Sequence, residues 1–275
     1  MRVAVQHGLR AAAGASSAVW RGDELLVLGA LDGVVDIFEP DAPDEAHDTQ
    51  LLTPVPRRHR FTTSPLAPEV LAGKRLFYSA TNSAMGVGGV SCSTCHFEGR
   101  TDGLTWTFET DTRQTPSLAG VVSTTAPVTW SGQVASVADE ADITTRGRMG
   151  GSGLTDDQLQ SIAAYVDSTP LAAPATVDAD LVARGYALFV RSDAGCYGCH
   201  GGDQLTDREV HVVNGKVRDT PSLLGLAGSG PYMSDGSSRT VRDVLERARE
   251  PGFMGDTSML TDEDLDALEA FLLSR

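Results

Sequence analysis

The chain of 275 residues contains four cysteines, and all four lie in two copies of one five-residue motif. The copies read Cys92-Ser-Thr-Cys95-His96 and Cys196-Tyr-Gly-Cys199-His200. No cysteine is left over to form a disulfide elsewhere. Any fold for this chain must therefore place two copies of one motif in two equivalent local environments.

The motifs lie inside a longer repeat, because residues from about 66 to 169 resemble those from about 178 to 275 in the order and spacing of their landmarks. A Gly-x-x-Leu-Phe element precedes each motif, and an Arg-x-Thr-Pro-Ser-Leu element, a proline, a glycine and a Met-Gly pair follow it. The landmarks are Gly73–Phe77 and Gly185–Phe189, Arg113–Leu118 and Arg218–Leu223, Pro127 with Gly132 and Pro231 with Gly236, and Met149–Gly150 and Met254–Gly255. We therefore predict two tandem domains, residues 65–172 and 173–275, with a proline-bearing hinge at 168–176.

Each copy ends in a stretch with the apolar spacing of an amphipathic helix. Thr155 with Gln158 forms a capping box at the start of the first stretch, and Thr261 is placed to cap the second. The segments between the helices are rich in Gly, Pro, Ser and Thr, as in small domains that wrap a large apolar cofactor. We predict mainly α-helical domains whose closing helices bury Leu159, Ile162, Ala163 and Val166 in the first copy and Leu265, Leu268 and Leu272 in the second.

Residues 1–64 have a different pattern. Glu24 to Leu28 and Val34 to Phe38 are typical of two strands joined by a turn at Asp32-Gly33. A lone hairpin is marginally stable in water. We therefore interpret it as a short β-hairpin remnant of a larger β domain, or as a strand pair laid on the helical domains. The acidic stretch from Pro40 to Pro65 is predicted to be a linker.

The charge balance limits the partners of this chain. It has 37 acidic and 22 basic residues, a formal net charge of −15. This excess of negative charge disfavours nucleic acid and anionic membranes as partners and favours a neutral or basic partner. The alternative interpretation is that the acidic residues only keep the protein soluble. No apolar run approaches the ~20 residues of a membrane span. The first twenty residues make a weak signal peptide because their apolar middle is short.

The two motifs are typical of covalent haem attachment. Cys-x-x-Cys places two thiols about one helical turn apart, where they can form thioethers with the two vinyl groups of one porphyrin. The adjacent histidine then binds the iron, so His96 and His200 are the predicted proximal ligands. A redox-active cysteine pair, a four-cysteine zinc site and two disulfides are the alternatives. All three leave the histidines without a role, and we therefore predict two covalently bound haem c groups.

The sixth ligand decides whether each iron carries electrons or does chemistry. A methionine sulfur gives a closed, higher-potential haem, whereas an open position can bind peroxide. Met254 is the candidate ligand of the second iron, with Met259 as its alternative, and Met149 is the candidate for the first. The simpler interpretation is that these methionines only pack.

Three further side chains are candidates for the haem sites. Arg113 and Arg218 occupy matching positions and are candidates to pair with haem propionates, the alternative being ordinary surface arginines. Trp130 would face the second domain if the domains pack pseudo-symmetrically and could then link the haems, although a single tryptophan is more often core. No role is assigned to the remaining histidines, which are His7, His47, His59 and His211.

These landmarks resemble the bacterial di-haem cytochrome c peroxidase superfamily, which also contains the enzyme that matures the tryptophan tryptophylquinone cofactor. The resemblance covers residues from about 66 to 275. It implies that a small redox protein donates electrons to the second haem, and that Trp130 passes them to the first haem, where hydrogen peroxide is reduced. Met254 is peroxidase-like, whereas the maturation enzyme resembles a tyrosine-ligated case. The N-terminal hairpin also resembles the last blade of a β-propeller that some relatives carry upstream.

Two departures from the family pattern concern the first haem. The stretch Phe97 to Thr112 contains no histidine, although the family's peroxidases carry a distal one there. Arg148 stands directly before Met149, where they carry a glutamate, and a guanidinium cannot act as an acid or base. Gln133 and Glu140 lie nearby and are the candidate substitutes. Calcium between the domains, as in relatives, has no assignable ligands in this sequence.

Three functional hypotheses follow. The first is a peroxidase-type oxidoreductase with an open iron at His96. The second is a non-catalytic di-haem electron carrier in which Met149 and Met254 close both irons. The third is a haem redox or ligand-sensing module of a propeller fusion. Haem is attached outside the cytoplasm, so we predict a periplasmic or extracellular location.

Overall fold

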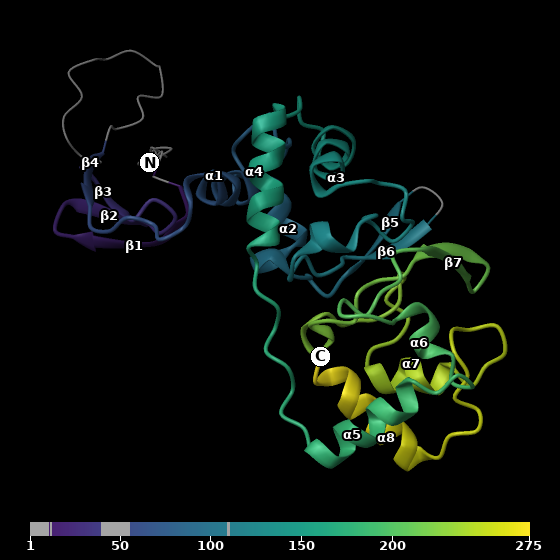
Figure 1. Ribbon diagram of the computed structural model, residues 1–275. Helices are drawn as coiled ribbons and strands as arrows, with labels where there is room; N and C mark the ends of the chain where they lie inside the picture. The colour runs from purple at the N-terminus through teal and green to yellow at the C-terminus, as the bar shows by residue number, and fades with distance from the viewer. Residues whose placement is uncertain (1–10, 12, 40–55, 109–110) are drawn as a thin grey trace, which may run out of the picture.

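The computed structural model describes residues 11, 13–39, 56–108 and 111–275. Most of the predicted linker and two of the histidines without an assigned role, His7 and His47, lie outside this part of the chain. Figure 1 shows a small sheet at one end, followed by two helical lobes joined by a long extended segment between α4 and α5.

The N-terminal part is a four-stranded antiparallel sheet with the strands in chain order. Its strands are β1 (Ala15–Arg21), β2 (Glu24–Gly29), β3 (Val34–Phe38) and β4 (Arg57–Arg60). The predicted hairpin is confirmed as β2 and β3, with Leu25 opposite Phe38. The sheet has two strands more than the predicted hairpin, since β1 and β4 flank it, and β4 falls in the stretch predicted as a linker. Arg58 holds β4 in place with two hydrogen bonds, at 2.7 and 2.9 Å, to the buried carboxylate of Asp36.

The remaining chain passes twice through one order of elements, and we call residues 68–167 the first repeat and 179–273 the second. In each repeat a helix, a short helix holding the motif, a two-stranded ribbon, a 3-10 turn and two further helices follow one another. The first repeat contains α1 (Pro68–Phe77), α2 (Cys92–Cys95), η1 (Phe97–Gly99), β5 (Thr105–Phe108), β6 (Asp111–Gln114), η2 (Val122–Thr125), α3 (Val137–Ile143), the π-helical turn η3 (Thr144–Arg148) and α4 (Asp156–Asp167). The second contains α5 (Ala179–Phe189), α6 (Cys196–Cys199), β7 (Val210–Val213), β8 (Lys216–Asp219), η4 (Leu226–Gly228), α7 (Val241–Arg247) and α8 (Asp262–Leu273). The ribbons and the sheet make the fold a mixture of helix and strand, so the prediction of a mainly α-helical fold holds only for the repeats' cores.

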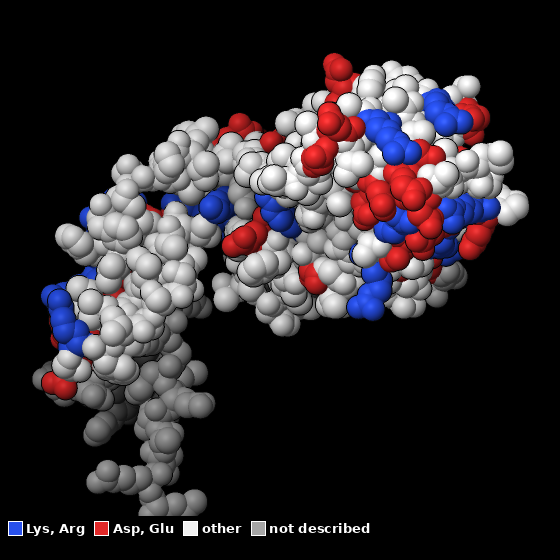
Figure 2. Space-filling model, turned by 90° about the horizontal axis from the view of Figure 1, so that it is seen from below, with Lys and Arg blue, Asp and Glu red and all other residues white. Residues whose placement is uncertain are grey.

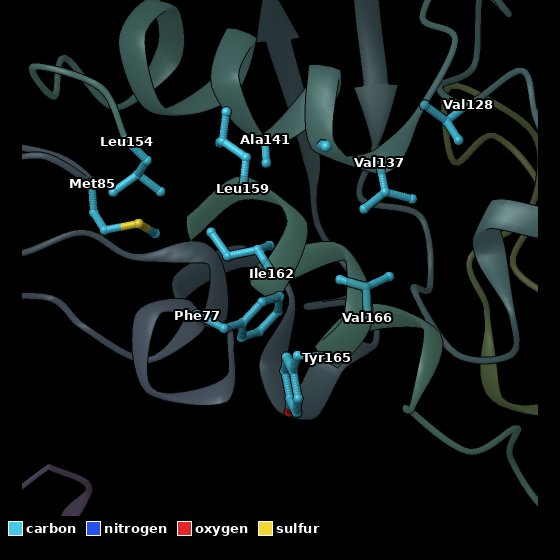
Figure 3. Close-up of a cluster of buried hydrophobic side chains, with 11 residues drawn as sticks. Phe77, Met85, Val128, Val137, Ala141, Leu154, Leu159, Ile162, Tyr165 and Val166 are labelled. Carbon is cyan, nitrogen blue, oxygen red and sulfur yellow. The ribbon is translucent and has the colours of Figure 1, made fainter. Parts of the chain in front are cut away.

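The first and last helices of each repeat pack against each other, α1 on α4 and α5 on α8. Their crossing points explain the Gly-x-x-Leu-Phe landmarks. A Cβ atom on Gly73 would lie 1.7 Å from the carbonyl oxygen of Ser161, and one on Gly185 would lie 2.0 Å from that of Ala267. Only glycine allows the backbones to approach this closely. Figure 3 shows the apolar core of the first repeat, in which Phe77 of α1 meets Ile162 and its neighbours on α4.

The capping predictions for the closing helices are confirmed. The Thr155 hydroxyl accepts from the Gln158 N–H at 3.4 Å, and the Gln158 side chain accepts from the Thr155 N–H at 3.0 Å. Thr261 caps α8 in the same way with Asp264. These boxes satisfy amide groups that the first turn of a helix leaves without partners.

The two repeats meet through a reciprocal pair of backbone hydrogen bonds. The Gln114 N–H of the first repeat donates to the Ser234 carbonyl of the second at 2.8 Å, and the Asp219 N–H of the second donates to the Trp130 carbonyl of the first at 3.1 Å. Gln114 and Asp219 end the two matching ribbons. The contact is therefore pseudo-symmetric, because matching positions of the two repeats donate across it.

Charged side chains are mixed on the surface of the second repeat. Figure 2, seen from below, shows acidic side chains gathered beside basic ones on the rounded lobe. Around α8, Arg184 pairs with Asp264 at 2.6 Å and Arg249 with Asp262 at 3.0 Å. No helix in the described part of the chain is long and apolar enough to cross a membrane.

Candidate haem cavity

A single cavity of about 1350 Å³ runs between the two repeats and reaches both motifs. Cys92, Cys95 and His96 line it on one side, and Cys196, Cys199 and His200 on the other. Sites for one small ligand usually have about 300 to 1,000 Å³. The volume and the placement of the motifs therefore fit more than one large group.

Both motif histidines are oriented by backbone carbonyl groups. The Nδ1 atom of His96 lies 3.1 Å from the carbonyl oxygens of Arg100 and Pro116, and that of His200 lies 3.1 Å from the oxygen of Leu205. Burial lowers the pKa of both histidines, so the neutral ring is favoured. With Nδ1 donating to a carbonyl, Nε2 is the nitrogen left for a metal. This is the arrangement that an axial iron ligand requires.

The four cysteines are free thiols, two on α2 and two on α6. Burial raises the pKa of Cys92 to about 12, and it also raises the pKa values of Cys95, Cys196 and Cys199. A thiol whose pKa is raised by burial is a poor nucleophile at neutral pH, which disfavours a redox-active cysteine pair. Within the described residues, the only cluster of metal-binding side chains is Cys199, Asp207 and His211, so the four-cysteine zinc site is excluded. The structure contains no disulfide between any two of these four cysteines.

The three candidate methionines differ in whether they line the cavity. Met149 and Met254 both line the cavity, directly after the π-helical turn in the first repeat and shortly before α8 in the second. Met259 is 85% exposed and lies outside the lining. We therefore discard Met259 as the alternative ligand of the second iron, because its side chain points to solvent.

The two arginine candidates converge on one carboxylate. Arg113 and Arg218 line the cavity at matching positions of β6 and β8. Arg113 Nε lies 3.2 Å from Asp111, and Arg218 Nη2 reaches the same carboxylate at 3.0 Å from the other repeat. Lys216 adds a third contact at 2.9 Å. These cations hold the pKa of Asp111 down at about 2, with Lys216 as the largest cause. The sequence offered no signal for Asp111, because its partners come from both repeats.

Trp130 lies where the two repeats meet. It lines the cavity, its indole Nε1–H donates to the Gln114 carbonyl at 2.8 Å, and its own carbonyl accepts from Asp219. Asp219 also lines the cavity, and its Oδ1 atom has no hydrogen-bond partner among the described residues. Burial, with a smaller effect of the Asp207 charge, raises the pKa of Asp219 to about 7. The tryptophan is thus fixed by groups from both repeats.

The candidates for an acid or base differ in position. Glu140 of α3 lines the cavity near His96, whereas Gln133 is exposed and lies outside the lining. Of these two candidates, only Glu140 therefore lies in the lining of the cavity. Among the histidines without a predicted role, His59 is exposed on β4, but His211 of β7 lines the cavity. Its Nε2 lies 2.7 Å from Asp207 and 3.8 Å from the Cys199 sulfur. The sequence did not predict this contact, because His211 and Cys199 are twelve residues apart.

Comparison with known proteins agrees with this geometry. A model of the cytochrome c family matches residues 182–275, which is the second repeat. The methylamine utilization protein MauG of Methylorubrum extorquens is 29% identical over an alignment that covers 66% of this chain and 69% of that protein.

Two solved structures show the same fold. Hydrazine synthase from Kuenenia stuttgartiensis superposes with a TM-score of 0.65 and 20% identity, over 77% of this chain and 89% of that one. The diheme peroxidase BthA from Burkholderia thailandensis has a TM-score of 0.54 and 18% identity, over 77% and 86% of the two chains.

Proposed function

The chain belongs to the di-haem cytochrome c peroxidase superfamily, and we propose that it uses two haem groups to pass electrons from a small redox protein to peroxide. It is a haem electron-transfer protein with covalently bound haem c. In the proposal, residues 65–172 form the domain of the first haem and residues 173–275 that of the second. Electrons enter at the second domain, and peroxide is reduced in the first.

One observation carries this proposal: a single cavity is lined by both motifs and by Trp130. Haem c supplies a one-electron carrier whose open coordination position can bind peroxide. The residues of this chain orient and separate the two groups. The thiols would attach each haem, His96 and His200 would bind the irons through Nε2, and Arg113 and Arg218 would donate to propionates.

The two sites would differ in their sixth ligand. Met254 lines the second part of the cavity and would close that iron, which suits it to electron transfer. Trp130 would carry the electron across the interface, because its ring and both of its hydrogen bonds lie where the repeats meet. An open first iron is what peroxide reduction needs.

The electron donor is expected to be a small redox protein with a neutral or basic docking face. The chain has a formal net charge of −15, and complementary charge speeds association between proteins. The covalent attachment of haem supports a periplasmic or extracellular location. Among the described residues, the one cluster of metal-binding side chains is Cys199, Asp207 and His211, and we assign no ligands to a calcium ion.

A second candidate function is a plain di-haem electron carrier, and the position of Met149 favours it. Met149 lines the first part of the cavity as Met254 lines the second, so both irons could be closed. Low-temperature paramagnetic resonance of the purified protein, oxidised and half-reduced, separates the two functions. One high-spin signal that disappears with peroxide supports the peroxidase. Two low-spin haems that do not respond to peroxide support the carrier.

The predicted ligand of the second iron is tested by Met254→Leu, which keeps the side-chain volume and removes the sulfur. We expect the loss of the Met-to-iron absorption band and a lower midpoint potential at one haem. Met259→Leu is the control and should leave both unchanged, since its side chain is 85% exposed. An unaltered band in Met254→Leu would reject Met254 as the ligand.

A further inference from the structure

One wall of the cavity differs in chemistry between the two repeats. In the first repeat it is formed by α3, the π-helical turn and Met149, and in the second by α7 and the loop to Met254. Both helices have seven residues and begin after a hydroxyl N-cap, Ser136 and Thr240, so their positions correspond one to one.

On this wall the first repeat is polar where the second is apolar. Glu140 corresponds to Val244 and Thr144 to Ala248. Arg148 stands directly before Met149, as the buried Phe253, which is outside the lining, stands directly before Met254. The three polar residues all line the cavity, as do Val244 and Ala248. The second repeat thus serves as an internal reference, an apolar wall without a titratable group at these positions.

The three polar side chains form one cluster. The Thr144 hydroxyl donates to Glu140 Oε1 at 3.1 Å, and Arg148 Nη1 donates to the same oxygen and to the Thr144 hydroxyl. The Arg148 guanidinium also lies 5.7 Å from the centroid of the Phe108 ring, which limits its movement. Glu140 is therefore held in one orientation by two donors on one of its oxygens.

The other carboxylate oxygen of Glu140 is free. Oε2 is buried and has no hydrogen-bond partner among the described residues. Leaving a buried acceptor without a hydrogen bond is unfavourable, and more so when the group is charged. Such a group is typical of a site where the missing partner is a ligand or a reacting molecule.

We propose that Glu140 is the acid–base catalyst for peroxide reduction in the first repeat, with Arg148 and Thr144 as its positioning residues. This inference rests on the proposed function. Arg148 cannot take the role itself, because its guanidinium stays protonated. The carboxylate can both accept and return a proton, which the neutral and apolar residues of the second repeat cannot.

Glu140 takes the proton from one oxygen of hydrogen peroxide and delivers it to the other oxygen, which leaves as water when the O–O bond breaks. The small redox protein supplies two electrons and solvent supplies two protons, which convert the remaining oxygen into a second water. The sum is H₂O₂ + 2 e⁻ + 2 H⁺ → 2 H₂O.

The test uses the full chain with both haems attached, as wild type, Glu140→Gln and Asp139→Asn. Glutamine keeps the shape of the side chain and its amide oxygen can still accept from Thr144, so the variant is expected to fold. Asp139 lies on the same helix, is exposed and is outside the cavity lining, so its variant removes one carboxylate without touching the site. Two rates are measured by stopped flow: oxidation of the reduced protein by hydrogen peroxide, and binding of potassium cyanide to the oxidised protein.

Cyanide is the readout that does not depend on turnover, because hydrogen cyanide must also give up a proton when it binds. We expect Glu140→Gln to lower the peroxide rate constant by about 100-fold or more, which is the usual effect of general acid–base catalysis. Its cyanide association rate should fall as well, while Asp139→Asn matches the wild type in both.

The outcomes separate this inference from the proposed function. Wild-type protein that reacts with neither peroxide nor cyanide would overturn both, since the first iron would then be closed. Wild-type protein that reacts with both, at the same rates as Glu140→Gln, would overturn the role of Glu140 alone. A fall in Glu140→Gln that Asp139→Asn reproduces would also overturn it, because net charge would then be the cause.

Discussion

The N–H of Asp219 donates a hydrogen bond to the carbonyl oxygen of Trp130 across 3.1 Å, so an atom of the second repeat fixes the aromatic residue that the first repeat presents at the interface. The indole Nε1–H donates in the other direction along the interface, to Gln114. A tryptophan held both at its main-chain carbonyl and at its indole nitrogen is suited to a constant electronic contact between two sites.

Trp130→Phe keeps an aromatic ring and removes the indole donor to Gln114. We expect the free energy of unfolding to fall by about 1 kcal/mol, the usual net value of one hydrogen bond. Electron transfer between the two haems should slow, as followed by the reoxidation of each haem after peroxide is mixed with the reduced protein. Trp20→Phe, at an exposed position of β1, is the control. Equal inter-haem rates in both variants would exclude Trp130 as the link.

Asp219→Asn changes how stability depends on pH. The pKa of Asp219 is raised from its ordinary value of 3.8 to about 7. Between about pH 4 and 7 the folded protein keeps the proton on Asp219, whereas the unfolded chain has lost it. The contribution of this carboxyl to the free energy of unfolding is therefore full below about pH 4 and is lost as the pH rises through about 7. For a half-exposed group we expect about 1–2 kcal/mol. Denaturant unfolding from pH 4 to 8 should show a flatter profile in the variant, and parallel profiles would contradict the assignment.

Asp111→Asn tests the ion cluster across the interface. The wild-type carboxylate accepts from Lys216 and Arg218 of the second repeat, and its pKa of about 2 lies below its ordinary value. Its contribution is therefore present above about pH 4 and is lost as the pH falls towards 2. We expect the free energy of unfolding of the variant to be lower by about 1–3 kcal/mol at neutral pH. The reason is that the charged donors then face a neutral amide, which is a weaker acceptor than a carboxylate. Asp193→Asn, in an exposed pair with Arg191, should unfold like the wild type.

Gly185→Ala tests the close crossing of α5 and α8. The added methyl group would lie 2.0 Å from the Ala267 carbonyl oxygen, so the helices must separate. We expect a loss of about 1–3 kcal/mol in the free energy of unfolding, as is usual for overpacking. Gly147→Ala is the control, because a methyl group there meets nothing within 4 Å. Thermal unfolding of the haem-loaded variants measures both, and equal midpoints would contradict the tight crossing.

Local patterns in the sequence predicted the local elements. The hairpin of β2 and β3 has alternating apolar residues around Asp32-Gly33, and α4 and α8 carry both an apolar face and a capping box. In each case the residues that decide the structure lie within a few positions of one another. The motif histidines were identified for the same reason, since each follows its cysteines directly.

The features that escaped prediction depend on distant residues. β4 forms only because β3 offers a free edge and Asp36 offers a partner for Arg58. The four-residue ribbons are too short for an alternating pattern, and Asp111 meets Arg218 only when the repeats dock. Glu140 was a candidate by proximity in sequence, but its fixed orientation depends on Arg148 beyond a π-helical turn that no sequence pattern announced.

The reciprocal hydrogen bonds between Gln114 and Ser234 and between Asp219 and Trp130 use only main-chain atoms. A substitution changes a side chain and leaves these donors and acceptors in place. The two halves can therefore accumulate different side chains around their haems while the distance between them stays the same. The backbone contact keeps the two repeats in one relative position. The cavity wall around Glu140 can therefore be charged and the wall around Val244 apolar without a change in how the repeats pack.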